Sequence, residues 1–143
     1  MNRNLLLVAV VGASAAAVFV LQPPKAPVVT ALAPTGGAAI VDVALPATYS
    51  QDAQIGKRGF DNNCAKCHGE NAGGQNGVAP ALVHSTYRPN HHADEAIQRA
   101  VGNGVRSHHW RFGDMPAVEG LTRADVSYII AYIRELQQEN GIN

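Results

Sequence analysis

The chain has two cysteines, which lie close together and are followed directly by a histidine. Cys64 and Cys67 enclose two residues, and His68 completes the pattern Cys-x-x-Cys-His. A structural zinc site needs four ligands, commonly from two such cysteine pairs, whereas this chain has one pair. A thiol redox pair of the thioredoxin type is expected after a strand, but a helical pattern precedes Cys64. A disulfide here would close a very small loop, add little stability, and leave His68 without a role.

The remaining interpretation of this pattern is covalent attachment of a c-type haem. Two thiols spaced by one helical turn can add to the two vinyl groups along one edge of a porphyrin. The next residue then carries an imidazole that can bind the iron. The sequence therefore predicts one covalently bound haem c with its iron, attached through Cys64 and Cys67, with His68 as an axial ligand.

A second ligand for the iron is available much later in the chain. Met115 is the only methionine besides the initiator, and it lies in the sequence Gly-Asp-Met-Pro. Pro116 restricts Met115 to an extended backbone, which predicts a loop rather than a helix at this position. A thioether ligand favours ferrous iron and raises the reduction potential of a haem. Met115 is therefore predicted as the second axial ligand, and the alternative role of a lone methionine is to fill a gap in the core.

Five further histidines lie in the predicted loops. They are His84, His91, His92, His108 and His109. Most exposed histidines have no specific role, and the alternative is a second metal site for copper or zinc. A histidine at 108–109 could also replace Met115 on the iron, which would give bis-histidine ligation and a lower potential. Arg106, Trp110 or Arg111 could donate a hydrogen bond to a haem propionate.

One short helix is predicted before the haem-attachment pattern and another after it. Residues 53–62 form the first, in which Gly56 and Gly59 lower helix propensity and so indicate that another element crosses closely. Residues 94–101 form the second, with the aspartate that begins it as the cap and Gly102 as its end.

The last helix has the clearest pattern in the chain. Thr122 is its predicted cap, and Asp125 occupies the capping-box position. Apolar residues then repeat at helical spacing, at Val126, Ile129, Ile130, Ile133 and Leu136. The domain is therefore predicted to be all-α, with long loops that a large cofactor in the core would explain.

The N-terminal segment predicts export. Residues 5–21 carry no charge and are almost wholly apolar behind Arg3, at the lower edge of the length that spans a bilayer. Residues 1–21 are predicted to be an uncleaved signal anchor. The alternative is a signal peptide that is cut after the small residues at 13–15.

A linker and one domain follow the predicted anchor. Residues 22–50 contain five prolines and are predicted to form a semi-extended linker. Within it, residues 38–45 are apolar enough to form a short strand or to dock on the domain. Residues 51–143 form the predicted domain, which is exported whether or not the anchor is cleaved.

The motifs together resemble the class I c-type cytochromes. The resemblance covers residues 51–136 and leaves the anchor and linker outside. Its elements are Gly56-x-x-x-Phe60 with Cys64-x-x-Cys67-His68, Ala79-Pro80-x-Leu82, Met115-Pro116, Leu121-Thr122, and Tyr132-Ile133-Arg134-x-Leu136.

This resemblance implies the small cytochrome c fold, with helices wrapped around one haem. It also implies thioether bonds at both cysteines and axial ligation of the iron by His68 and Met115. The carbonyl of Pro80 is then expected to accept a hydrogen bond from the ring of His68. Gly56 and Phe60 are expected to cross the last helix near its Tyr132.

These features predict a one-electron carrier rather than an enzyme, because a haem with both axial positions filled has no open position for substrate. The predicted location is the periplasm, either tethered to the inner membrane or soluble if the N-terminal segment is cleaved. A dehydrogenase or quinol-oxidising complex is the expected donor, and an oxidase or another cytochrome is the expected acceptor. Charge is balanced, with 11 basic and 11 acidic residues, and does not favour nucleic acid. The alternatives are a catalytic or peroxidase-like haem subunit, or a haem protein with an added histidine-based copper site.

Overall fold

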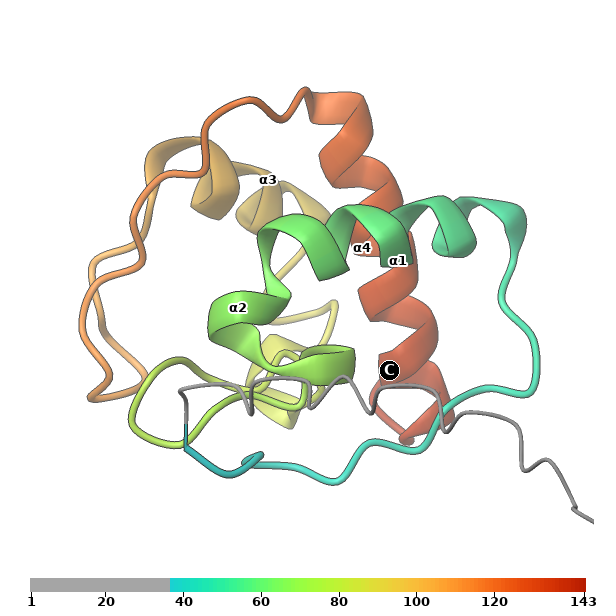
Figure 1. The fold of residues 1–143 in the computed structure, drawn as a ribbon, viewed down its shortest axis with the longest axis horizontal. Helices are drawn as coiled ribbons and strands as arrows, with labels where there is room; N and C mark the ends of the chain where they lie inside the picture. Colours follow the sequence, from blue (N-terminus) through green and yellow to red (C-terminus); the bar gives the residue numbers. More distant parts are fainter. Residues whose placement is uncertain (1–36) are drawn as a thin grey trace, which may run out of the picture. The chain divides into compact units, whose positions relative to one another are not determined.

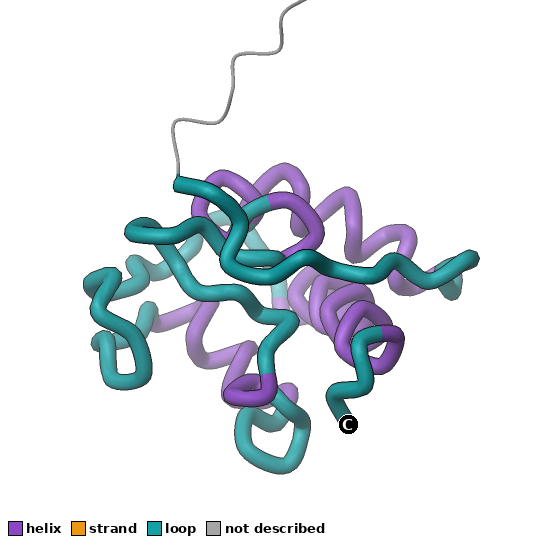
Figure 2. Tube along the Cα trace, turned by 90° about the horizontal axis from the view of Figure 1, so that it is seen from below, coloured by secondary structure: helices purple, strands orange, loops and turns teal. Residues whose placement is uncertain are grey.

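The computed structural model describes residues 37–143, and the predicted anchor and the first part of the linker lie outside them. The helices are α1 (Gln51–Asn63), α2 (Ala65–His68), α3 (Asp94–Asn103) and α4 (Arg123–Glu139), with 3₁₀ turns at Glu70–Ala72 and Ser85–Tyr87. Residues 37–143 contain isolated bridges but no strand (Figure 2). The prediction of an all-α fold is therefore confirmed. Among the described residues, no helix has the length and apolar character needed to cross a membrane.

The crossing of α1 and α4 forms the centre of the core (Figure 1). A Cβ atom on Gly56 would collide with the backbone carbonyl of Tyr128, so the two helix backbones touch at this point. The ring of Phe60 lies 5.6 Å from the ring of Tyr132, and both side chains are fully buried. The prediction that glycine marks a close crossing in the first helix is confirmed.

The caps of α1 and α4 follow from their local sequences. The Ser50 hydroxyl accepts a hydrogen bond from the backbone N–H of Ala53 at 3.2 Å, so α1 begins two residues before the prediction. Thr122 and Asp125 form the predicted capping box. The Asp125 N–H donates to the Thr122 hydroxyl at 3.2 Å, and the Thr122 N–H donates to the Asp125 carboxylate at 2.9 Å.

Both ends of α3 differ from the prediction. Its cap is Ala93, and Asp94 is the first helical residue; the Asp94 carboxylate instead accepts a hydrogen bond from Arg134 Nε at 2.9 Å. The helix ends at Gly104, which has a left-handed φ of 73°, whereas Gly102 keeps a helical backbone. A glycine ends a helix where the chain must turn into this conformation, and that requirement falls at Gly104.

The end of the predicted linker lies against the domain. The backbone N–H groups of Ile40 and Val41 both donate to the carbonyl of Gly73, at 3.1 and 3.0 Å. The Asn140 side chain exchanges hydrogen bonds of 3.0 and 2.9 Å with the backbone of Ala44, and Val43 packs on the core. Of the two alternatives for residues 38–45, the structure therefore shows docking on the domain and not a strand.

Candidate haem site

One helical turn carries both cysteines and the histidine. The backbone N–H groups of Cys67 and His68 donate to the Cys64 carbonyl at 3.1 and 2.9 Å, which closes the turn directly after α1. Both thiols are free, with Cys64 half-buried and Cys67 exposed. Burial, with a smaller effect from the neighbouring Cys67, raises the pKa of Cys64 to about 11. The structure contains no disulfide between these residues, so both sulfur atoms are available for thioether bonds to a haem.

His68 is a buried histidine whose orientation is fixed. The residue is 8% exposed, and its Nδ1 lies 2.9 Å from the carbonyl oxygen of Pro80. Because a carbonyl can only accept, Nδ1 carries the proton and Nε2 keeps a lone pair for a metal. Burial lowers the pKa of His68, although the hydrogen bond to Pro80 partly opposes this effect. The neutral imidazole is the form that binds iron, and this geometry matches the one that the resemblance implies.

The glycine-rich loop after His68 turns back and forms hydrogen bonds with α2, the helix that carries Cys67 and His68. Gly69 and Gly74 have left-handed φ angles of 74° and 75°, and the Gly74 N–H donates to the His68 carbonyl at 2.7 Å. Gln75 is buried, and its side-chain amide donates to the carbonyls of α2 residues Ala65 (3.2 Å) and Lys66 (2.9 Å). Gln75 therefore fixes the attachment turn. Sequence reasoning missed it because a single glutamine in a loop belongs to no motif.

Met115 lies in a loop, as predicted, and its backbone is held on both sides. Met115 and Val105 exchange two backbone hydrogen bonds of 2.9 Å, which form an isolated antiparallel bridge. The Val118 N–H donates to the Val101 carbonyl at 2.9 Å and ties the far side of the loop to α3. The loop is thus fastened to the end of α3, and Met115 itself is half-buried.

The predicted site residues line one cavity of about 650 Å³. This volume falls within the range of about 300–1,000 Å³ that is typical of ligand and cofactor sites. The predicted residues in its wall are Cys64, Cys67, His68, Pro80 and Met115. Much of the remaining wall is apolar and includes Leu82, Val101, Val105, Ile129 and Ile133. The structure therefore brings together the residues that the sequence placed up to 51 positions apart.

A buried polar atom in the cavity wall provides an independent test of whether these residues suit a haem. The Trp110 indole Nε1 is buried and has no hydrogen-bond partner among residues 37–143. Trp110 lines the same cavity, and a buried N–H without a partner is costly unless a ligand accepts its proton. Two thiols, a neutral imidazole, a thioether, apolar walls and a free donor together fit a haem with its propionates.

The basic residues around the cavity differ from those expected. Arg106 and Arg111 were expected to donate a hydrogen bond to a haem propionate, but neither is among the described residues that line the cavity. Arg99 does line the cavity. Arg99 shares a face of α3 with Ala96 and Asn103, which also line the cavity. Their spacing of three and four residues is helical, so periodicity in α3 could have identified Arg99 from the sequence.

The extra histidines lie at the edge of this site. His92, His108 and His109 line the cavity, whereas His84 packs edge-on against Trp110 with ring centroids 5.1 Å apart. Desolvation, and then the neighbouring His108, lower the pKa of His109.

Comparison with known proteins identifies the family. The cytochrome c family model matches residues 53–137, which is more than half of the chain. A search of the curated proteins found no match. The match begins in α1, ends in α4, and contains the attachment turn, the Pro80 loop and the Met115 loop. The chain therefore belongs to the cytochrome c family of haem-based electron carriers, and its cofactor is a covalently bound c-type haem with iron.

Proposed function

We propose that this protein is a one-electron carrier whose haem iron is held by His68 and Met115. The observation that carries this proposal is the position of Met115, which lines the same cavity as His68 and lies in a loop held by backbone pairing with Val105. The bound haem supplies one-electron chemistry. With both axial positions filled by the protein, it has no open position for a substrate.

The surrounding residues are suited to holding such a centre with little rearrangement. Pro80 keeps His68 in one tautomer and one orientation, which also raises the basicity of the ligand. The Val105 pairing restricts the backbone of Met115. Apolar residues such as Ile129 and Ile133 form part of the cavity wall. A thioether ligand in a largely apolar site supports a raised reduction potential.

The edge of the site supports electron exchange with a protein partner. Cys67 and Val78 line the cavity and are also exposed, so the site extends to the surface at these residues. Val78 is one of two exposed large apolar residues among residues 37–143. Because the formal charges balance, we propose short-lived apolar docking around Val78 rather than strong electrostatic steering. A dehydrogenase or quinol-oxidising complex would be the donor, and an oxidase or another cytochrome would be the acceptor.

The proposed location is the periplasm. The uncharged apolar run at 5–21 supports export, and it would act as a tether to the inner membrane or be removed as a signal peptide. A tether would keep the carrier close to membrane-bound partners and raise its effective concentration there. Fractionation of cells that express the full chain tests this: haem-containing protein in the periplasm or inner membrane is expected, and its accumulation in the cytoplasm would contradict export.

The ligand binding of the reduced protein tests the carrier function. The full chain is expressed with a haem-attachment system, and absorption spectra are recorded in both redox states. Reversible reduction with little carbon monoxide binding at neutral pH is expected, because Met115 fills the distal position. Rapid and tight binding of carbon monoxide would overturn the carrier function in favour of an enzyme with a labile distal site.

A further inference from the structure

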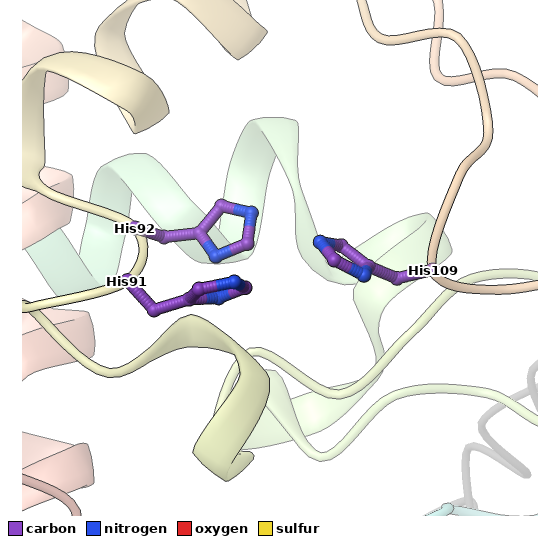
Figure 3. A group of neighbouring side chains, drawn as sticks. All are labelled: His91, His92 and His109. Carbon is purple, nitrogen blue, oxygen red and sulfur yellow. The ribbon is translucent and has the colours of Figure 1, made fainter.

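Three histidine rings from two separate loops lie close together (Figure 3). His91 and His92 follow the Ser85–Tyr87 turn, and His109 comes from the loop that leads to Met115. One ring nitrogen from each lies within 4.8 Å of the others. The ring centroid of His109 is 5.4 Å from that of His91 and 5.2 Å from that of His92. His92 and His109 also line the haem cavity, but none of the three histidines is a proposed axial ligand of the haem iron.

Hydrogen bonds prepare two of these rings for metal binding. The Nδ1 atoms of His91 and His92 each lie 2.7 Å from the carbonyl oxygen of Thr86. A carbonyl can only accept, so both Nδ1 atoms carry protons and both Nε2 atoms keep lone pairs. Metal-binding histidines commonly donate their second nitrogen to a backbone carbonyl in this way. The ring of His109 has no hydrogen bond to any described residue, so its ring remains available as a ligand.

The turn that carries His91 and His92 is fastened to α4. Arg134 donates to the carbonyls of Tyr87 at 2.8 Å and His92 at 2.5 Å. The fully buried Gln137 donates to the Tyr87 carbonyl at 3.1 Å. Two of the three ligands would therefore come from a turn whose backbone is held by α4. His109 would supply the third ligand from a separate loop.

We propose that His91, His92 and His109 form a second metal site, separate from the haem iron, which takes a divalent transition metal such as Cu²⁺ or Zn²⁺. Neutral imidazoles suit these ions, whereas Mg²⁺ and Ca²⁺ prefer oxygen ligands. Bonds of about 2.0–2.1 Å place tetrahedral ligands roughly 3.4 Å apart. The exposed side chain of His109, whose ring makes no hydrogen bond to any described residue, can close the remaining separation by rotation. Three histidines leave a fourth position for water.

His108 provides a matched control for this assignment. It is adjacent to His109, with ring centroids 4.2 Å apart, but it is not a member of the three-histidine group. Its Nδ1 lies 2.9 Å from the carbonyl of Arg106. A ligand role specific to His109 predicts that His108→Gln leaves metal binding intact while His109→Gln does not.

The full-length, haem-loaded protein is first treated with a chelator to remove bound metal. Calorimetric titration with metal ions then tests the proposed site. One equivalent of Cu²⁺ or Zn²⁺ is expected to bind, with Cu²⁺ tighter, and Mg²⁺ is expected not to bind. His92→Gln and His109→Gln should each weaken binding by about 10- to 100-fold or more, because even residues that only orient ligands contribute this much. The haem absorption spectrum of each variant verifies that it folds and holds its cofactor.

Three results would overturn the proposal. The first is no uptake of Cu²⁺ or Zn²⁺ by the wild-type protein. The second is weak uptake of several equivalents that His92→Gln and His109→Gln leave unchanged, which would indicate scattered surface binding. The third is loss of binding in His108→Gln with normal binding in His109→Gln, which would assign the metal to other ligands.

Discussion

The backbones of Val105 and Met115 exchange two hydrogen bonds of 2.9 Å, and this pairing holds the loop that supplies the proposed distal ligand. The residue before Val105 completes the arrangement. Gly104 ends α3 with a φ of 73° and lies directly against the carbonyl of Met115. The end of α3 and the position of Met115 therefore depend on the same glycine.

We expect Gly104→Ala to disturb the Met115 loop. An alanine there would have a strained backbone and a Cβ in contact with the Met115 carbonyl, at a cost of about 1–3 kcal/mol in the free energy of unfolding. The weak red absorption of ferric iron bound to methionine sulfur should also decrease. Gly102→Ala is the control, because Gly102 is helical and a Cβ there meets no atom within 4 Å. Equal effects of the two substitutions would show that Gly104 has no special role.

The hydrogen bond between His68 and Pro80 should set part of the reduction potential. Pro80→Ala frees the backbone that positions the carbonyl acceptor, so the His68 ring loses orientation and basicity. A less basic ligand stabilises ferric iron less, and the reduction potential is expected to rise. Redox titration measures this change, with the exposed Pro89→Ala as the control. A potential that is unchanged or lower in Pro80→Ala would contradict the assigned role of this hydrogen bond.

The crossing of α1 and α4 should tolerate no side chain at Gly56. A Cβ there meets the backbone of Tyr128, which can move only if the whole helix moves. Gly56→Ala is therefore expected to lower the free energy of unfolding by about 3 kcal/mol or more in urea titrations of the haem protein. Gly59→Ala is the control, because its Cβ meets the Ile129 side chain, which can adjust. A smaller cost for Gly56→Ala than for Gly59→Ala would contradict this packing.

The buried amide of Gln137 should stabilise the loop that precedes the three histidines. Its Nε2 donates to the carbonyls of Leu82 and Tyr87 at 2.8 and 3.1 Å. Gln137→Leu leaves these carbonyls without that donor, so we expect a loss of about 1–3 kcal/mol in the free energy of unfolding. The exposed neighbour Gln138→Leu should change it by less than about 0.5 kcal/mol. Similar effects of both substitutions on the free energy of unfolding would contradict the structural role assigned to Gln137.

The features that the sequence predicted well are those determined within a few residues. The attachment turn needs only Cys64, Cys67 and His68 on one turn of helix, and the capping box needs only Thr122 and Asp125. Such local geometry is a property of the segment itself, so a motif specifies it. The glycines of α1 also carried a clear signal, because a helix accepts their low propensity where a neighbour crosses closely.

The features that the sequence could not predict depend on distant contacts. Asp94 was expected to cap α3, but Arg134, which is 40 residues away, binds its carboxylate. Gln75 acts through carbonyls in α2, and no local pattern distinguishes it from an ordinary loop glutamine. The docking of residues 38–45 likewise depends on Gly73 and Asn140, whose positions only the folded chain determines.

The absorption spectrum of the ferric protein tests the proposed ligation by His68 and Met115 most directly. The wild-type protein is predicted to show the weak red band of iron bound to methionine sulfur. Met115→Ala should abolish this band, open the distal position to carbon monoxide in the ferrous state, and lower the reduction potential. A wild-type protein without this band, or a band that persists in Met115→Ala, would contradict the assignment of Met115 as the distal ligand.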